Sequence, residues 1–288
     1  MAIPIIDTHQ HLWDLKRFNL PWLTNASDAI NRSFEIKDFR AAANGCNVTK
    51  SIYMEVDVHP AQQVEEARFA IGLCEDPGTQ VSGAVIGGQP HDPGFAEYLK
   101  QFAGVRAVKG VRMVLHSSDR PPGLCLTPQF VDSMKRLANV GFTFDLCMRS
   151  DELLTGAQLA AKCPQTTFVL DHCGNIGLPA RDAAVRHVWR EGIKAVAAQP
   201  NVVCKISGLI DKTGTTEGSP QDLAGTINFC IDAFTEDRVV FGGDWPVCLL
   251  GGSYKHWVDT LKQVVQDRSE ACRKKLFHDN AIRVYRLA

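Results

Sequence analysis

Hydrophobic and polar positions along the chain follow two patterns that replace each other regularly. Short runs rich in Val, Ile, Phe and Leu, bounded by Gly, Pro or Asp, are typical of buried strands. Longer segments between them place apolar residues every three or four positions, as an amphipathic helix does. The expected strands are residues 3–9, 50–56, 80–87, 107–115, 142–148, 166–173, 201–208 and 238–245.

Strands that alternate with helices indicate βαβ units and a parallel sheet. Clear helical patterns occupy residues 59–76, 128–141 and 181–200. Eight such strands in 288 residues predict an α/β fold, one closed (β/α)₈ TIM barrel that takes up residues 1–288 as a single domain. An open doubly wound sheet is the alternative, but no glycine-rich phosphate turn follows the first strand.

Residues 12–34 form an unusually long connection between the first strand and its expected helix at 35–45. Loops of this length are usually lids or binding loops, or they are disordered. Trp13, Phe18 and Trp22 argue against disorder. We therefore expect the segment to fold over the active site at the mouth of the barrel, with Trp13 or Trp22 facing the pocket.

Composition narrows the class of protein. Hydrophobic residues make up 45% and charged residues 22%, and the net charge of −1 provides no field that would attract nucleic acid or an anionic membrane. No apolar run approaches the roughly 20 residues of a membrane span, and Asp7 interrupts the first apolar run too early for a signal peptide. We expect a soluble, cytoplasmic protein that acts on a small molecule, without nucleic-acid or membrane partners; a homo-oligomer stays open.

Ten cysteines are present without a C-x-x-C pair or a zinc-ribbon spacing. Several of them lie inside apolar runs, where cysteine behaves as a small hydrophobic residue. Without a secretory signal, buried thiols are expected rather than disulfides.

The candidate chemistry lies at the ends of three expected strands. His9 and His11 are two positions apart, so they project to one side of the first strand at its carboxyl end. His172 ends the sixth strand and Asp244 ends the eighth, at the barrel face where active sites gather. A lone histidine is more often structural, and Asp244 could simply cap a helix. Imidazoles and a carboxylate that converge on one face nevertheless indicate a metal site or a general-base site.

The motifs "DTHQH", "DHCGN" and "GGDWP", with "VKGVR" and "VVCKISGL" between them, occur in order at these strand ends. Together they resemble the amidohydrolase superfamily, specifically its amidohydrolase-2 branch of small-lactone hydrolases, over nearly the whole chain. The resemblance implies a carboxylic ester hydrolase of carbohydrate catabolism that opens a sugar lactone such as L-fucono- or L-rhamnonolactone; muconolactone and pyrone lactones stay open. The alternatives are a metal-dependent non-oxidative decarboxylase of a small unsaturated or aromatic acid and a non-catalytic binding protein.

The resemblance also implies roles for individual residues. Asp244 would take a proton from the attacking water and pass it to the leaving alkoxide. His9, His11 and His172 would polarise the carbonyl, directly or through a divalent cation. Further candidates for contact with the substrate are Arg112, Lys109, Glu55, Trp13, Trp245 and His116. Of the two cations in "VKGVR", Arg112 is preferred, because a planar guanidinium can chelate a carboxylate or vicinal oxygens.

The fifth strand departs from the pattern of the binuclear members of the superfamily. It reads "FTFDLCM", with neither the bridging lysine of binuclear members nor the histidine of many mononuclear ones; Asp145 lies too far from the strand end to be an obvious bridge, and Cys147 is the only soft ligand near it. A binuclear centre is therefore not expected. One Zn²⁺ on His9, His11, His172 and Asp244, or catalysis without a metal, both remain open.

Overall fold

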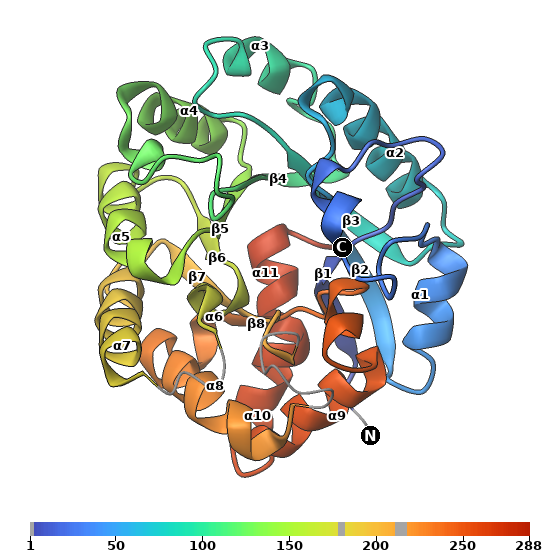
Figure 1. The fold of residues 1–288 in the computed structure, drawn as a ribbon, viewed down its shortest axis with the longest axis vertical. Coiled ribbons are helices and arrows are strands. Elements are labelled where there is room, and N and C mark those ends of the chain that lie inside the picture. Colours follow the sequence, from blue (N-terminus) through green and yellow to red (C-terminus); the bar gives the residue numbers. More distant parts are fainter. Residues whose placement is uncertain (1–2, 178–181, 211–217) are drawn as a thin grey trace.

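The computed structural model describes residues 3–177, 182–210 and 218–288. Eight parallel strands lie side by side in chain order, and helices surround them (Figure 1). The strands are β1 (Ile5–Gln10), β2 (Val48–Met54), β3 (Val81–Gly87), β4 (Val108–Val114), β5 (Thr143–Cys147), β6 (Phe168–Leu170), β7 (Val202–Ile206) and β8 (Val239–Phe241). The expected (β/α)₈ barrel is confirmed.

The helices begin where the sequence provides caps for their first N–H groups. Asp182 accepts hydrogen bonds from the first turn of α7, and Ser219 forms a capping box with Asp222 at the start of α8. The helices are α1 (Ile36–Ala42), α2 (Gln63–Glu75), α3 (Phe95–Lys100), α4 (Pro128–Asn139), α5 (Leu153–Lys162), α6 (His172–Asn175), α7 (Ala183–Ala197), α8 (Pro220–Phe234), α9 (Tyr254–Val264), α10 (Glu270–Lys274) and α11 (Asn280–Tyr285). Within the described ranges, no helix has the length and apolar character needed to cross a membrane.

A layer of apolar side chains from the strands fills the inside of the barrel. It contains Ile6, Ile52, Met54, Val85, Val169, Val203 and Val240. Helix α11 packs Ala281, Val284 and Tyr285 against this layer, and it lies at the centre of the ring of strands in Figure 1. One end of the barrel is therefore closed by the last helix, which leaves the carboxyl ends of the strands for the active site.

The first and last strands meet along a seam of hydrogen bonds. The Thr8 hydroxyl donates to the Phe241 carbonyl at 2.6 Å. Farther along, the Asp244 N–H donates to the His9 carbonyl at 2.8 Å, and the His11 N–H donates to the Trp245 carbonyl at 2.7 Å. Residues from the two ends of the chain thus become neighbours where the barrel closes.

Strands β6 and β8 are shorter than the sequence predicts, and a residue with left-handed backbone follows each of them within three positions. His172 has φ 54° and Asp244 has φ 55°, values that an extended strand does not contain. Both side chains therefore lie in turns just beyond their strands.

The long connection 12–34 is folded. Trp13 packs edge-to-face against Trp22 and Phe34, with ring centroids 5.7 and 5.3 Å away, and its indole N–H donates to the Arg32 carbonyl. The Trp22 indole N–H donates to the Val56 carbonyl at 2.8 Å, which joins the loop to the end of β2.

Candidate active site

Two imidazoles meet at the end of β1. The register of β1 against β2 shifts between Asp7 and Gln10, and such an irregularity changes the direction in which the following side chains point. His9 and His11 both project to the inside of the barrel, with their Nε2 atoms 3.1 Å apart.

Asp244 joins these imidazoles from the turn after β8. Its Oδ1 lies 3.4 Å from Nε2 of His9 and 3.5 Å from Nε2 of His11. The preceding Gly243 packs so closely that a Cβ there would lie 2.4 Å from the Asp7 carboxylate, so the turn requires glycine. The close packing fixes Asp244 beside the two histidines.

His172 reaches the same place from an unusual turn. All four residues of α6 (His172–Asn175) have positive φ, at 54°, 51°, 74° and 56°. Nδ1 of His172 lies 2.9 Å from the Ser207 hydroxyl and 4.0 Å from Oδ2 of Asp244, and its ring centroid is 4.6 Å from that of His9. The structure therefore brings together the three histidines and the aspartate that the sequence singles out.

The protonation of His11 follows from its partners. Burial, followed by the charge of Arg112, lowers the pKa of His11 to about 3, so the ring is neutral at pH 7. Its Nδ1 lies 3.0 Å from the Met54 carbonyl, which can only accept, so the proton is on Nδ1. Nε2 of His11 consequently directs a lone pair into the site.

His9 has two alternative hydrogen-bond partners for Nδ1. Burial and the charge of Lys205 lower the pKa of His9 well below its usual range, so this ring is also neutral. Lys205 Nζ lies 3.3 Å from Nδ1 and donates, which leaves the proton of His9 on Nε2 to bond His11. Asp171 Oδ1 lies 3.6 Å from the same Nδ1; a small approach would let it accept from Nδ1, which would leave two Nε2 lone pairs facing each other. The second arrangement calls for a cation between the rings.

The imidazoles and carboxylates of this site could hold a metal ion. Nε2 of His9, Nε2 of His11 and Oδ1 of Asp244 form a triangle with sides of 3.1, 3.4 and 3.5 Å. A single cation with bonds of about 2.0–2.2 Å can bridge atoms at such separations. A second trio of ligands, His9, Asp171 and His172, lies within 4.8 Å and shares one residue with the first.

Beneath the imidazoles lies a buried charge cluster that the sequence did not reveal. Lys205 is 0% exposed, pairs with Asp145, and lies 2.9 Å from Asp171 Oδ1. Burial opposes the charge of Lys205, but the two carboxylates outweigh it and raise the pKa of this lysine. Burial likewise opposes the charge of Asp171, whereas Lys205 and His9 hold its pKa well below the usual range. One sequence pattern could have indicated that Lys205 points into the barrel. Alternate residues of a strand point to opposite faces, so in "CKIS" Lys205 lies on the opposite face of β7 from the buried Cys204.

Arg112 and Glu55 are bound to each other. Arg112 Nε donates to Glu55 Oε1 at 2.6 Å and Nη2 donates to the Glu55 carbonyl at 3.0 Å, while Nη1 lies 3.5 Å from Nε2 of His9. Glu55 Oε2 accepts from the Asp57 N–H at 2.7 Å. Nε and Nη2 of Arg112 are therefore engaged by Glu55, while Nη1 faces the imidazoles, and the substrate contact that the sequence suggested for Arg112 stays a prediction.

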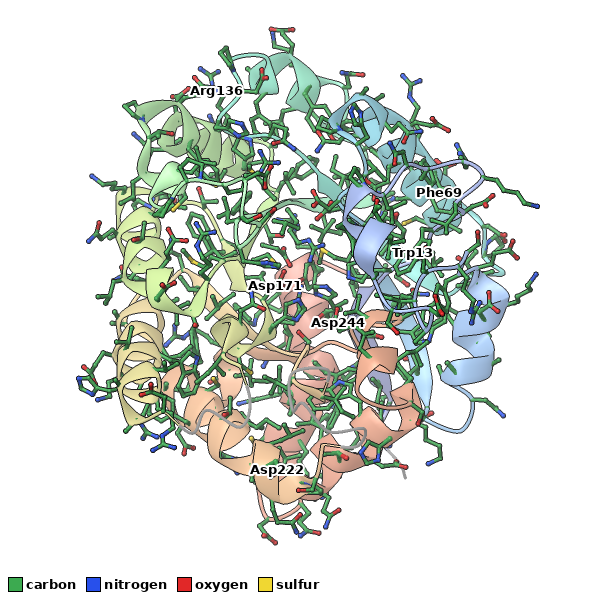
Figure 2. All side chains as sticks on the ribbon, viewed as in Figure 1. Trp13, Phe69, Arg136, Asp171, Asp222 and Asp244 are labelled. Atoms are coloured by element: carbon green, nitrogen blue, oxygen red, sulfur yellow. The ribbon has the colours of Figure 1, made fainter. Side chains whose placement is uncertain are left out.

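A cavity of about 830 Å³ opens above the cluster. His11, Arg112, His172 and Asp244 line it, and Asp244 lies near the centre of the barrel in Figure 2, whereas Arg136 lies on the outside. Among the other expected residues, His116 lines the cavity, as does Trp22 from the long loop.

Three expected contacts lie elsewhere. Lys109 is three positions before Arg112 on β4 and so points to the opposite side of the strand, where it lines a separate hollow beside the chain end. Trp13 is 1% exposed within its loop, and Trp245 packs against Phe34. These positions correct the sequence-based expectation for Lys109, Trp13 and Trp245.

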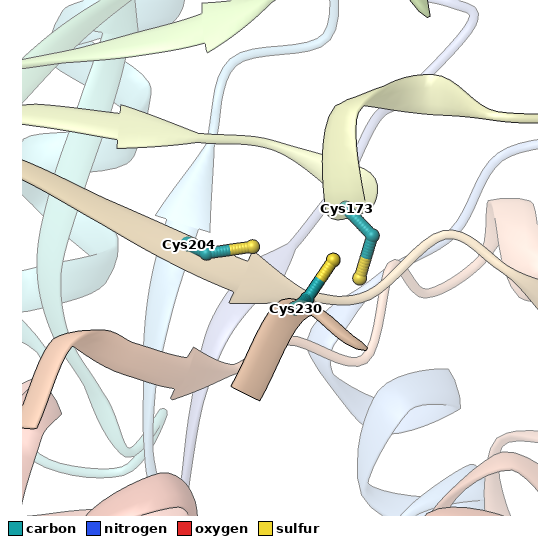
Figure 3. Close-up of side chains that lie close together, drawn as sticks. All are labelled: Cys173, Cys204 and Cys230. Carbon is teal, nitrogen blue, oxygen red and sulfur yellow. The ribbon is translucent and has the colours of Figure 1, made fainter. Parts of the chain in front are cut away.

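The ten cysteines are all described, and within that part of the chain all are thiols rather than disulfides, as expected. Cys173, Cys204 and Cys230 gather behind the site, from the α6 turn, β7 and α8 (Figure 3). Burial raises the pKa of Cys204 and Cys230 well above the usual range, so these thiols stay protonated. They serve as small apolar residues in the core.

A family model described as Amidohydrolase (Amidohydro_2) matches residues 6–287. An uncharacterized protein, y4mH, of Sinorhizobium fredii is 29% identical over 99% of both chains. L-fucono-1,5-lactonase of Burkholderia multivorans is 26% identical over 98% of this chain and 96% of its own.

Solved structures show the same architecture. An amidohydrolase from Burkholderia multivorans with bound HEPES superposes with a TM-score of 0.89 at 25% identity, covering 99% of this chain and 100% of the other. A second crystal form with bound zinc gives 0.88 at 24% identity, with the same coverage.

Proposed function

The chain belongs to the amidohydrolase family, whose match spans residues 6–287, and we propose that this enzyme hydrolyses a small lactone ring. The observation that carries the proposal is Asp244, which lies at the floor of the cavity within 4.0 Å of three imidazoles. Lactonase relatives such as that of Burkholderia multivorans support the assignment.

Asp244 acts as the base in this proposal. Its carboxylate takes one proton from a water molecule as the water oxygen bonds to the lactone carbonyl carbon. The tetrahedral oxyanion then collapses, the bond from the carbonyl carbon to the ring oxygen breaks, and the ring oxygen receives the proton from Asp244. One water is consumed and a hydroxy acid is released.

The neighbouring groups can stabilise the oxyanion. The Ser207 hydroxyl can donate to Nδ1 of His172, which leaves the proton of His172 on Nε2 as a donor. Arg112 Nη1 adds positive charge beside His9. His9, His11 and Asp244 would hold one Zn²⁺, an ion that prefers imidazole nitrogen and carboxylate oxygen. When bound, this ion would polarise the ester carbonyl as a Lewis acid.

The charges along the cavity favour an uncharged sugar lactone over a carboxylated one. The guanidinium of Arg112 is paired with Glu55, and that of Arg149 donates to the Ser117 and Arg120 carbonyls. The cavity also presents the carboxyl groups of Asp57 and Asp151, which would repel an anion and can accept hydrogen bonds from hydroxyl groups. We therefore propose a lactone of the L-fucono- or L-rhamnonolactone class.

The proposal is tested by measuring proton release from a panel of lactones. L-fucono-1,5-lactone and L-rhamnono-γ-lactone should be hydrolysed faster than 2-pyrone-4,6-dicarboxylate. Asp244→Asn keeps the shape of the side chain but cannot take the proton, so turnover should fall by about 10²–10⁴-fold. Circular dichroism and thermal unfolding provide the control for folding.

Two results would contradict this function. One is a folded Asp244→Asn variant that hydrolyses its best lactone at the wild-type rate. The other is CO₂ release from an aromatic or unsaturated acid by an enzyme that opens no lactone in the panel.

A further inference from the structure

Exposed apolar side chains surround the mouth of the cavity, and the hydrolytic chemistry proposed for its floor does not require them. Among the described residues, the large apolar side chains with clear exposure are Leu15, Trp22, Leu154, Val185, Val188 and Leu250. Three of these, Trp22, Val185 and Val188, line the same cavity. Exposed apolar residues that gather on one surface, rather than being scattered, mark a binding site.

Val185 and Val188 are on the first turns of α7, where residues three apart lie side by side. They are 46% and 47% exposed. The face of this helix that packs on the barrel uses other residues, Trp189, Ile193 and Val196, which are at most 3% exposed. The two valines are therefore not needed for the packing of α7.

Three further apolar side chains line the same cavity. They are Ala184 from α7, which is exposed like the two valines, and Val56 after β2 and Val247 after β8, which are less exposed. The polar side of the cavity, which includes Ser117 and Asp151, follows β4 and β5 instead.

The size of the cavity also exceeds the needs of a simple sugar lactone. Its volume of about 830 Å³ lies near the top of the range of roughly 300–1,000 Å³ that holds drug-sized ligands. A six-carbon sugar lactone is a much smaller molecule and would leave Val185 and Val188, which we call the valine wall, in contact with water.

We propose that the substrate is an uncharged lactone whose ring carries an apolar alkyl or aryl substituent, which lies against Trp22, Val185 and Val188. This inference rests on the proposed lactonase function and extends its substrate class beyond the six-carbon sugar lactones to larger uncharged lactones. The lactone ring would occupy the floor beside Asp244, and the substituent would extend toward the mouth. Burial of the substituent supplies binding energy in proportion to the apolar area removed from water.

The test compares δ-nonalactone, which carries a butyl group, with its unsubstituted parent δ-valerolactone. Each fully buried methylene contributes roughly fourfold in binding, and the mouth is only half enclosed, so kcat/KM should favour the butyl compound by about tenfold. In a Val185→Ser/Val188→Ser variant this preference should fall to about twofold or less. The matched control, Leu15→Ser/Leu154→Ser, replaces two exposed leucines outside the cavity and should keep the wild-type preference.

Binding of stable analogues separates this inference from the proposed function. Calorimetry with 2-piperidone and 6-butyl-2-piperidone requires no hydrolysis, and the wild-type protein should bind the butyl compound about tenfold more tightly. That result without hydrolysis of any lactone would support the apolar subsite and reject the lactonase. Hydrolysis of lactones without a butyl preference in either measurement would overturn the subsite and leave the lactonase standing.

Measuring the oligomeric state tests whether a second copy of the chain, rather than a substrate, covers Val185 and Val188. If the Val185→Ser/Val188→Ser variant changes from dimer to monomer in light scattering and keeps its butyl preference, these valines form a subunit interface. That outcome would overturn the proposal.

Discussion

Glu66 is a carboxyl group in surroundings that disfavour its charge. Its Oε1 accepts hydrogen bonds from the Tyr53 hydroxyl at 3.0 Å and the Val56 N–H at 2.7 Å. Its Oε2 is buried and has no hydrogen-bond partner among the described residues. Burial, followed by the charge of Glu55, raises the pKa of Glu66 from 4.5 to about 8, so the folded protein keeps it protonated at neutral pH.

Glu66→Gln should therefore stabilise the protein above pH 5. A raised carboxyl pKa gives a contribution to stability that is complete below pH 4.5 and is lost as the pH rises through about 8. Glutamine has the shape of the protonated acid and does not ionise, so at pH 8 the free energy of unfolding should rise by about 1–3 kcal/mol. Urea unfolding at pH 4.5 and pH 8 measures the difference, which should nearly vanish at the lower pH.

The matched control is Glu65→Gln, which removes the neighbouring carboxylate from an exposed ion pair with Arg17. Exposed pairs contribute about 0–1 kcal/mol, so this variant should change little at either pH. If Glu66→Gln destabilised the protein at pH 8, the buried carboxyl group would have to be ionised.

The two hydrogen-bond arrangements of His9 correspond to catalysis with and without a metal ion, so experiments on metal dependence distinguish them. We expect chelation to abolish lactone hydrolysis and Zn²⁺ to restore it, with His9 bonded to Asp171 in the loaded enzyme. His9→Asn should reduce zinc binding, measured by equilibrium dialysis, by at least tenfold. Full activity in a preparation that holds almost no metal would instead mean that Lys205 donates to His9 and that the imidazoles act directly.

The sequence allowed the four main residues of the site to be predicted, because each lies at the end of a strand and parallel strand ends meet. Asp171 and Lys205 could not be found in this way. Their partnership joins β7 to the turn after β6, and a lysine in a strand is ordinarily read as a solvated side chain. Arg112 was found, but its ion pair was not, because its partner Glu55 is 57 residues away in the chain.

At the level of elements, the α6 turn concentrates backbone strain at the site. Four consecutive residues, His172–Asn175, have left-handed backbone, which costs roughly 1–2 kcal/mol per residue other than glycine. Such strain persists only where the surroundings hold it. Trp189 donates to the Cys173 carbonyl at 2.8 Å and Asn175 donates to the Met148 carbonyl at 2.9 Å, so α7 and the end of β5 both hold this turn.

Gly208→Ala tests how tightly neighbouring elements position His172. Gly208 follows β7 with φ 57°, and a Cβ there would lie 2.2 Å from Nδ1 of His172. The imidazole would have to move and would lose its contact with Ser207. We expect kcat to fall by about 10–100-fold and the free energy of unfolding by about 1–2 kcal/mol.

Gly225→Ala in α8 is the control, because no atom lies within 4 Å of the added Cβ. This variant should gain up to about 1 kcal/mol of stability without loss of activity. A Gly208→Ala enzyme with wild-type kcat would show that the position of His172 is not critical.

Element boundaries were predictable where the sequence carries local signals, as at Asp182 and Ser219 before α7 and α8. The ends of β6 and β8 were not. Left-handed residues such as His172 and Asp244 follow these strands, and residue type alone does not tell where such backbone occurs. The packing of Gly208 and Gly243 that permits these turns comes from distant parts of the chain.

At the scale of the whole molecule, the active site lies on the seam that closes the barrel. His9 and His11 come from the first strand and Asp244 from the turn after the last. The alternation of strands and helices was sufficient to predict the barrel, because the connections leave few other topologies. It could not predict that a register shift in β1 and the hydrogen bonds of the seam together direct the imidazoles toward Asp244.

Thr8→Val should weaken this seam without changing the shape of the side chain. The Thr8 hydroxyl is buried and donates to the Phe241 carbonyl at 2.6 Å, so the substitution leaves that carbonyl without this donor in the core. The free energy of unfolding should fall by about 1–3 kcal/mol. Thr49→Val removes an exposed hydroxyl that bonds the Ile5 carbonyl between β1 and β2, away from the seam, and should cost about 0.5 kcal/mol or less.

The same variant tests whether the site and the barrel unfold together. Because the reacting groups meet only across the closed seam, activity and far-UV ellipticity should be lost at the same urea concentration. In Thr8→Val both transitions should shift downward by the same amount. If activity disappeared at a clearly lower urea concentration than ellipticity, the seam between β1 and β8 would open while the rest of the barrel stayed folded. Opening of the seam would then be a local unfolding step, separate from the unfolding of the whole barrel.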